Sequence, residues 1–334
     1  MAASVTAVTL SSAPRSVSPG MAAATSLVMM AMTAAGSENV GNGIGLLEDR
    51  YVLGELLGAG SMGRVFSAFD TVLRIDVAVK MMHPELVASR RNVARFALEA
   101  RIAARLLSRH AVAVLGLAVT TAGVPCIVYE RLQGETLGER IARTGGVSLV
   151  DTLEIVKQTS LALTRAHAIG VIHRDVKPDN IFLTCDASGR LLVKLLDFGI
   201  AEAADTHGRY AHCQLAGTPE YMAPEALLGR CEVDARADVY ALGVVAFECL
   251  TGACPVEGDV AEVVELLRAG TRTALTDRRP DLEGPLDAWM DRALHPDPVW
   301  RFSSIKELRD ELVAATRRAA GSTQATRVTL REAA

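Results

Sequence analysis

The stretch that decides the fold is LGAGSMGRVFSAFDTVLRIDVAVK, Leu57–Lys80. It opens with three glycines in the pattern Gly58-x-Gly60-x-x-Gly63. This spacing lets a backbone approach phosphates closely, because glycine has no Cβ and reaches positive φ. The same spacing begins dinucleotide-binding folds and also forms nucleotide-covering loops of a different fold, so the residues that follow must decide.

The residues after the third glycine have the pattern of a β-hairpin. Val65, Ser67 and Phe69 alternate with the residues between them, and β-branched residues return over Val72–Val79. A dinucleotide-binding turn would run directly into an amphipathic helix, and the chain has no G-x-x-x-x-G-K-[ST] for a P-loop. The stretch before the glycines, residues 51–57, also reads as a strand. The glycines are therefore predicted at a β-turn-β corner.

An ion pair is expected between this hairpin and the next helix. The second strand ends at Lys80, and residues 94–107 (ARFALEARIAARLL) predict a helix with one apolar face, formed by Phe96, Ala100, Ala103 and Leu107. Glu99 borders this apolar stripe, where an unpaired carboxylate would be costly. A cationic partner is therefore expected, and Lys80 is the obvious candidate.

The sequence VIHRDVKPDNIFL, residues 171–183, carries the strongest chemical signal. Apolar residues flank a polar loop that holds a carboxylate, an ammonium and an amide. Phosphoryl transfer needs an oriented nucleophile, metal ions on the phosphates and positive charge where negative charge develops. Asp175 would accept the hydroxyl proton of the acceptor, Lys177 would steady the γ-phosphoryl group, and Asn180 would hold a magnesium ion. The plain alternative is a polar surface turn.

Two further motifs follow in a matching order. KLLDFG places Asp197 directly after a strand, and GTPEYMAPE ends at Glu225. Together with the glycine loop, VAVK and HRDVKPDN, they resemble the eukaryotic-type protein kinases, and the helix around Glu99 resembles the bacterial Ser/Thr members. The resemblance covers residues 51–312, nearly everything except the two tails.

The resemblance implies an α+β bilobal fold, with a small β-rich N-lobe carrying one main helix and a larger, mostly helical C-lobe. It implies transfer of the γ-phosphate of ATP, with Mg²⁺, to protein substrates. A lysine two residues after the catalytic aspartate resembles Ser/Thr-directed members. The implied catalytic residues are Asp175, Lys177, Lys80 and Glu99, and the implied metal ligands are Asn180 and Asp197. The implied nucleotide-binding residues are Leu57, Gly58, Ala59, Gly60, Ser61, Gly63, Val65, Ala78, Lys80, Glu130 and Leu132.

Other positions match supporting roles. Tyr129 falls at the gatekeeper position before the hinge, and Arg301 is expected to pair with Glu225. Asp238 suits either an N-cap or the family aspartate that braces the catalytic loop. The residues after it, Val239–Leu250, predict a buried helix that is too short to span a membrane.

Composition sets the remaining expectations. The net charge is −4 over 334 residues, and no basic run suggests nucleic acid. Six scattered cysteines indicate free thiols in a reducing cytoplasm. We expect a low-complexity, disordered extension at 1–46, a kinase domain at 47–313 and a polar tail at 314–334, with the lobes dividing into 47–130 and 131–313. No membrane span is expected, and a homodimer is left open.

The activation segment departs from the family pattern. Where bacterial relatives usually carry paired threonines, this chain has Tyr210 and His212. Thr218 matches a structural threonine, and Thr206 is our hypothesis for a phosphate that Arg174 would receive.

Two rival functions remain open. A pseudokinase that only binds ATP usually lacks a key residue, and here all are present. A related small-molecule phosphotransferase generally lacks the Ala-Pro-Glu segment and its arginine partner, both found here.

Overall fold

The structure of the protein is a computed structural model that describes residues 46–47, 49–197, 218–229 and 233–332, with side chains up to residue 319. Residues 1–45 of the expected extension lie outside this part. The chain divides into two compact units. The first holds the described residues up to Arg105 together with Val112–Gln133, and the second holds Leu106–Ala111 and the chain from Gly134 onward. We describe each unit by itself.

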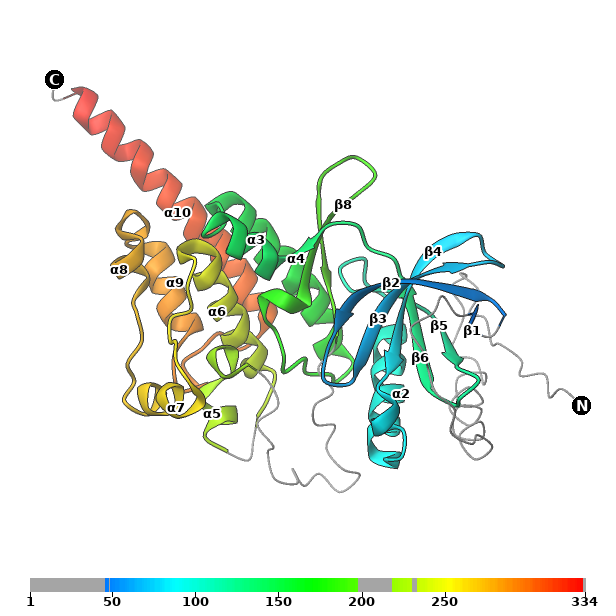
Figure 1. The fold of residues 1–334 in the computed structure, drawn as a ribbon. Coiled ribbons are helices and arrows are strands. Elements are labelled where there is room, and N and C mark those ends of the chain that lie inside the picture. The colour runs from blue at the N-terminus through cyan, green and yellow to red at the C-terminus, as the bar shows by residue number, and fades with distance from the viewer. Residues whose placement is uncertain (1–45, 48, 198–217, 230–232, 333–334) are drawn as a thin grey trace, which may run out of the picture. The chain divides into compact units, whose positions relative to one another are not determined.

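The first unit is an antiparallel sheet with one long helix (Figure 1). The strands follow the order β1-β2-β3-β4-β6-β5. Their bounds are β1 Leu46–Leu47, β2 Tyr51–Ala59, β3 Gly63–Asp70, β4 Ile75–Met82, β5 Val114–Val119 and β6 Pro125–Glu130. A 3₁₀ turn, η1 (Pro84–Leu86), leads into helix α2 (Arg90–Arg105), which lies beside β5.

The core of this unit follows from the alternation of the strands. Val77 and Val79 on β4 are fully buried, as is Val128 on the neighbouring β6. Successive side chains of a strand point to opposite faces, so these residues fill one side of the sheet. On α2, Phe96 and Ala100 are buried at helical spacing. The expected hairpin and the expected helix are both present. The expectation for Leu107 is wrong, because α2 ends at Arg105 and the Leu107 side chain is 88% exposed.

The second unit is mostly helical. A small sheet of order β7-β8-β9 is formed by β7 Glu135–Thr136, β8 Ile181–Cys185 and β9 Leu191–Leu195. The helices are α3 Leu137–Thr144, α4 Leu149–Ala168, α5 Pro224–Leu227, α6 Arg236–Thr251, α7 Val260–Arg268, α8 Leu275–Arg278, α9 Pro285–Ala293 and α10 Ile305–Glu332. The 3₁₀ turns are η2 Pro178–Asn180, η4 Pro219–Tyr221 and η5 Pro280–Leu282.

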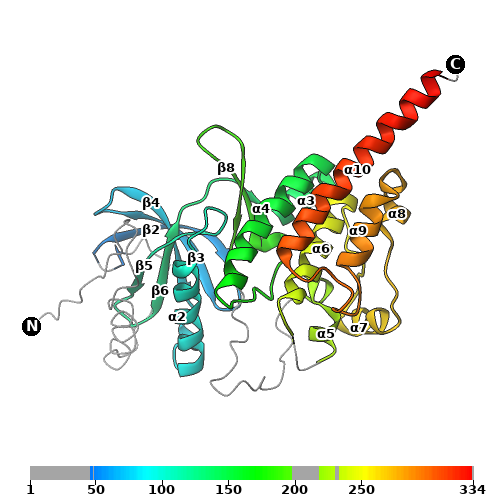
Figure 2. The ribbon, with the colours of Figure 1, turned by 180° about the vertical axis from the view of Figure 1, so that it is seen from behind.

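Helix α6 forms the centre of this unit. Its side chains are buried on every face between Ala237 and Phe247, as the unbroken apolar sequence predicts. It ends at Gly252, whose φ of 79° is the left-handed conformation that a helix C-cap favours. Helices α4, α9 and α10 pack around it (Figure 2).

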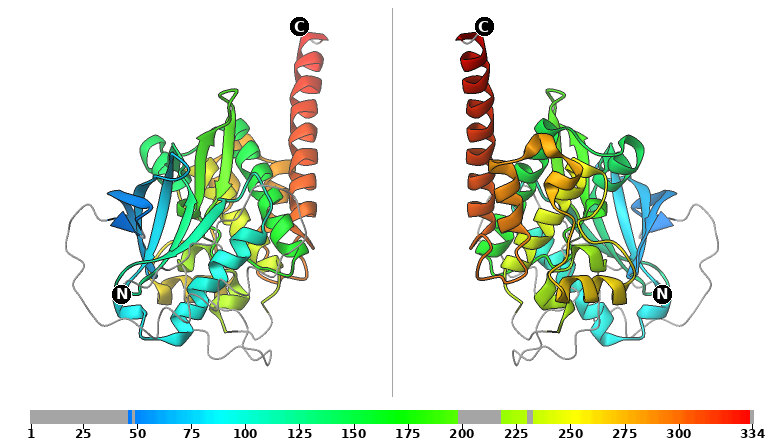
Figure 3. Two further views of the ribbon diagram at one scale, coloured as in Figure 1. Left: turned by 90° about the vertical axis from the view of Figure 1, so that its right-hand side faces the viewer. Right: turned by 90° about the vertical axis from the view of Figure 1, so that its left-hand side faces the viewer.

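Helix α10 continues through the segment expected as a polar tail. Its buried side chains are Ile305, Leu308, Leu312 and Ala315, and its later turns extend past the other helices of the unit (Figure 3). Within the described residues, no helix combines the length and apolar character needed to cross a bilayer. The α+β architecture of one β-rich unit and one helical unit is confirmed.

Candidate active site

The glycine turn closes the hairpin of β2 and β3. The N–H of Gly60 donates to the carbonyl of Gly63 at 2.9 Å, and the reverse bond measures 3.4 Å. A Cβ on Gly63 would lie 2.2 Å from the backbone oxygen of Met81 on β4. Gly63 is therefore required by the close approach of two strands. The predicted β-turn-β corner is correct.

Gly58 and Gly60 have no such internal reason. A Cβ at either position meets nothing within 4 Å in the described chain, and neither residue has a positive φ. The fold itself tolerates a side chain at both positions. A ligand whose atoms approach the backbone, such as a phosphate, would account for both glycines.

A histidine that the sequence did not single out, His83, holds this turn from the position just after β4. The backbone N–H of His83 donates to the carbonyl of Met62 at 3.0 Å. Its ring Nε2 lies 2.8 Å from the carbonyl of Gly60, so the ring donates there. A lone histidine after a strand gives no sequence signal for this contact, which depends on how the turn folds back.

The expected ion pair is present in the same unit. Lys80 Nζ lies 2.7 Å from Glu99 Oε1, and the two residues are only 7% and 8% exposed. The pair joins β4 to α2. The hydroxyl of Tyr129, on β6, donates to the same carboxylate oxygen at 2.9 Å. The sequence placed Tyr129 at the gatekeeper position but gave no reason to expect this bond.

Glu130, directly after Tyr129, is bonded to Ala113 through both its backbone and its side chain. The N–H of Glu130 donates to the carbonyl of Ala113 at 3.0 Å, and the Glu130 carboxylate accepts from the N–H of Ala113 at 2.8 Å. On β4, Ala78 pairs with Tyr129. Leu132 follows the end of β6 by two residues.

The predicted catalytic loop, within residues 171–183, lies in the second unit, and its polar groups converge. The side-chain nitrogen of Asn180 donates to the carbonyl of Asp175 at 2.8 Å and to its Oδ2 at 2.9 Å. Lys177 Nζ lies 3.4 Å from the other carboxylate oxygen of Asp175. The same ammonium donates to the hydroxyl of Thr218 at 3.2 Å. A carboxylate, a cation and an amide thus surround one point, where a hydroxyl acceptor could be deprotonated.

Asp197 follows β9 beside this loop. The N–H of Leu196 donates to the backbone carbonyl of Asn180 at 2.8 Å, which ties the two segments together. Asp197 has a φ of 27° and Arg174 a φ of 65°, both uncommon for residues with a side chain. Such conformations persist only where the surroundings hold them, and they cluster at functional sites.

A buried aspartate braces the loop from α6. Asp238 accepts hydrogen bonds from the backbone N–H groups of His173 (2.9 Å) and Arg174 (2.8 Å) and from the ring of His167 (2.7 Å). Burial raises the pKa of Asp238, but the bond from His167 and the nearby imidazole charges outweigh it, so the net shift is downward. The alternative role as an N-cap is wrong, because α6 is preceded by Ala235 and Asp238 lies inside its first turn.

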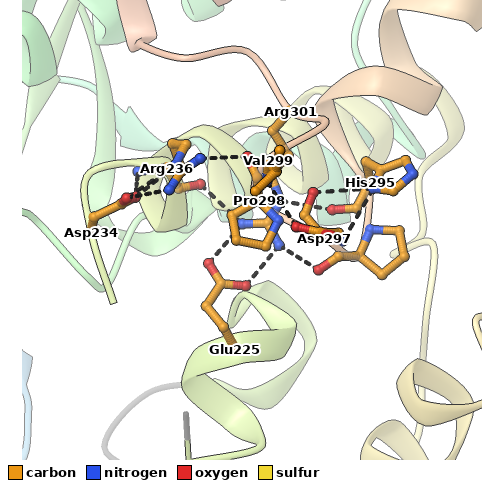
Figure 4. Close-up of polar contacts among 9 residues, drawn as sticks. Glu225, Asp234, Arg236, His295, Asp297, Pro298, Val299 and Arg301 are labelled. Carbon is orange, nitrogen blue, oxygen red and sulfur yellow. Dashed lines mark hydrogen bonds and ion pairs between the residues drawn. The ribbon is translucent and has the colours of Figure 1, made fainter. Parts of the chain in front are cut away.

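The expected pair of Glu225 and Arg301 is bidentate and buried (Figure 4). The two Nη atoms of Arg301 donate to the two carboxylate oxygens at 2.8 and 2.7 Å. The remaining N–H groups reach the carbonyls of His295 (2.7 Å), Pro296 (3.0 Å) and Arg236 (3.2 Å). All five donors of the guanidinium are satisfied.

The predicted residues thus fall into two groups, one in each unit. Glu99, Lys80 and the glycine loop belong to the first unit, and the catalytic loop with Asp197 belongs to the second. Several expected features lie outside the described residues, namely Phe198 and Gly199 of the DFG motif, and Thr206, Tyr210 and His212 of the activation segment.

Comparisons with known proteins agree with this geometry. The family model described as "Protein kinase domain" matches residues 51–313. The chain is 39% identical over 274 residues to the serine/threonine-protein kinase PknB of Mycobacterium tuberculosis (strain H37Rv), covering 80% of this chain and 43% of PknB. It is 38% identical over 263 residues to the serine/threonine-protein kinase Pkn1 of Myxococcus xanthus, covering 78% of this chain and 37% of Pkn1.

Solved structures show the same fold. The crystal structure of the M. tuberculosis PknI kinase domain matches with a TM-score of 0.64 and 30% identity, covering 83% of this chain and 100% of that domain. The chain spans less than half the length of PknB and Pkn1. The family match covers most of the sequence and includes every motif described above. The chain belongs to the protein kinase domain family, and its named relatives are bacterial serine/threonine kinases.

Proposed function

We propose that this protein is a serine/threonine protein kinase that transfers the γ-phosphate of ATP to hydroxyl groups of proteins. The observation that carries the proposal is the catalytic loop, where Asn180 and Lys177 hold the two carboxylate oxygens of Asp175 between them. A carboxylate fixed in this way can accept the proton of a substrate hydroxyl as it attacks phosphorus. Asp238 keeps the backbone of the loop in place.

ATP is the proposed phosphate donor. The open space at Gly58 and Gly60 supports a close approach of phosphates to the loop. Lys80, oriented by Glu99, would hold the α- and β-phosphates. At the hinge, the Glu130 N–H and carboxylate already pair with Ala113, so the backbone carbonyl is the atom proposed to meet adenine, together with the N–H of Leu132. Leu57, Ala59, Ser61, Gly63, Val65 and Ala78 complete the proposed nucleotide site.

Magnesium is the proposed metal, and the donor set fits it. Asn180 uses its amide nitrogen on Asp175, which leaves the amide oxygen as its metal-binding atom. Asp197 supplies a carboxylate from the adjoining segment. Mg²⁺ commonly takes one or two protein oxygens and completes its shell with water and phosphate oxygens. Consistent with this, the described residues contain no cluster of three or more His, Cys, Asp or Glu side chains that could hold a metal by themselves. Bound there, the ion would neutralise charge on the phosphates.

The cellular setting is also a proposal. Cys126, Cys185, Cys249 and Cys254 are free thiols, which supports a reducing cytoplasm. The bacterial relatives are named as serine/threonine kinases, which supports protein hydroxyls as acceptors. A homodimer remains a prediction, because a structure of one chain does not test it.

The test is phosphate transfer from labelled ATP and magnesium, to the protein itself and to a generic basic protein. Asp175→Asn should lower the rate by roughly 10²–10⁴-fold, the range typical of losing a positioned acid or base. Asp310→Asn serves as the matched control, because this carboxylate lies exposed on α10 and pairs with Lys306. It should leave the rate unchanged.

The same experiment separates the rival function. Phosphoamino-acid analysis of the product should find phosphoserine or phosphothreonine. An ATP-binding scaffold would bind nucleotide equally well in both forms and transfer nothing in either. That outcome would overturn the kinase assignment.

A further inference from the structure

Strand register places Tyr129 beside the ion pair. In the antiparallel ladder of β4 and β6, Tyr129 pairs with Ala78, and Lys80 pairs with Ile127. Residues two apart on a strand share a face, so Lys80 and Ala78 project to the same side of the sheet. Tyr129 lies on that side as the diagonal neighbour of Lys80, within reach of a long side chain.

The phenol and the ammonium share one acceptor. Glu99 Oε1 accepts from Lys80 Nζ at 2.7 Å and from the Tyr129 hydroxyl at 2.9 Å. Tyr129 is 6% exposed, so this hydrogen bond to a carboxylate is shielded from water. Bonds to ionised groups are shorter and stronger than neutral ones, and a dry site strengthens them further.

We propose that Tyr129 is a positioning residue that holds Glu99, and with it α2, in place for Lys80. This rests on the kinase function proposed above, in which Lys80 must be oriented toward ATP. Lysine is a point charge on a flexible four-carbon stem, so one ion pair fixes the helix poorly. The phenol is a rigid group from a second strand. Anchored to both β4 and β6, Glu99 is held before any nucleotide binds.

The hydroxyl, and not the ring, carries this role. A phenylalanine at 129 keeps the buried ring and its packing, so Tyr129→Phe removes only the donor. Tyr51→Phe is the matched control, because Tyr51 is also a buried tyrosine of this sheet, 4% exposed, on β2.

The first measurement is hydrogen exchange of the α2 amides in the whole protein without nucleotide. Losing a hydrogen bond to a charged group should speed exchange by about tenfold in Tyr129→Phe. Tyr51→Phe should leave α2 exchange at the wild-type rate. Equal acceleration in both variants would mean general loosening of the unit and would overturn the proposal.

The second measurement is steady-state transfer. Tyr129→Phe should lower kcat by about tenfold. The same change should have no further effect in a Glu99→Leu background, where the acceptor is absent, as expected for two groups acting through one contact. A purely structural tyrosine would instead give additive losses. If the wild type transfers phosphate while Tyr129→Phe changes neither α2 exchange nor kcat, the inference fails and the kinase stands. If the wild type transfers nothing while α2 exchange still quickens, the kinase assignment fails and the anchoring role stands.

Discussion

Arg301 is a buried side chain whose geometry no other residue can copy. Lysine offers three donors from one point, whereas the guanidinium satisfies Glu225 and three backbone carbonyls at once. Arg301→Lys keeps the charge but leaves buried acceptors without a donor, so it should lower the free energy of unfolding by about 1–3 kcal/mol. Denaturant titration measures this.

The control for that experiment is an exposed arginine. Arg268 on α7 pairs with Glu265, and their side chains are 59% and 71% exposed. Arg268→Lys should change the free energy of unfolding by less than about 1 kcal/mol. Similar losses for both substitutions would contradict the role given to the buried pair.

Asp238 should make stability depend on pH. Its pKa in the folded protein lies below the ordinary value of 3.8, so its stabilising contribution is complete above that value and is lost as pH falls through the lower folded pKa. Asp238→Asn should thus destabilise strongly near neutral pH, and the gap to wild type should shrink as pH falls below 3.8. Unfolding titrations across this range measure the gap.

Asp287 serves as a comparison, because its pKa is shifted in the opposite direction to that of Asp238. Burial raises the pKa of its carboxyl, so its ionised form is disfavoured in the folded protein. Asp287→Asn should stabilise the folded protein at neutral pH and make no difference in acid. A gap for Asp238→Asn that stays constant with pH would contradict our account of the brace.

At the residue scale, ion pairs were the contacts most readily predicted from the sequence. Glu99 borders an apolar stripe, and such a carboxylate demands a cation, which the structure supplies in Lys80. The contacts of Tyr129 and His83 were not predictable, because each depends on strand register or on the path of a turn. Neither side chain borders an apolar stripe in the sequence in a way that would call for a partner.

At the scale of elements, we expect the glycines of the β2–β3 turn to differ in role, with Gly63 needed for folding and Gly60 for binding ATP. Gly63→Ala should lower the free energy of unfolding by about 2–3 kcal/mol, because the new Cβ meets the backbone of Met81 and β3 must move away from β4. Gly60→Ala should change it by less than about 0.5 kcal/mol, since the Cβ enters open space. It should instead raise the KM for ATP several-fold.

Denaturant titration and ATP kinetics on the two variants test this division. The two substitutions are chemically identical and three residues apart, so each is the control for the other. A Gly60→Ala variant that unfolds as readily as Gly63→Ala would show that the turn itself, and not a ligand, requires the glycine.

Element types were predictable where periodicity is strong, and element ends were not. The alternation after Gly63 and the apolar run of α6 each allowed only one structure. The start of α6 was missed by a few residues, because Asp234 and Asp238 both suit a cap. In the structure, Asp234 accepts from the N–H and the guanidinium of Arg236, and its pKa is lowered by those bonds against the effect of burial. The Asp238 side chain instead accepts hydrogen bonds from the backbone N–H groups of His173 and Arg174.

At the scale of the whole molecule, the two units do not follow the chain in a simple order. Leu106–Ala111, directly after α2, belongs to the second unit, where the carbonyl of His110 accepts from the N–H of Leu195 at 2.8 Å. Ala111 forms a parallel bridge with the same strand residue. Pairing between residues so far apart in sequence leaves no local pattern. The sequence therefore could not predict that Leu106–Ala111 belongs to the second unit.

The end of α10 should be dispensable for folding. The last buried side chain described on this helix is Ala315. Removal of residues 321–334 should therefore shift Tm by less than about 2 °C. Leu308→Ala, on the buried face, should lower the free energy of unfolding by about 2–5 kcal/mol. Thermal melts of both variants decide whether the later turns contribute, and a large drop on truncation would mean that they do.

The projecting part of α10 makes the C-terminus suitable for attaching labels, surface linkers or fusion partners. From Thr316 to Glu332 the helix rises about 25 Å at about 1.5 Å per residue. A fluorophore, surface linker or fused protein attached after Ala334 would thus be carried on a stiff arm, away from the helices that brace the catalytic loop. Such an arm suits immobilisation through the C-terminus, because the tether would stand clear of the catalytic loop of its own unit.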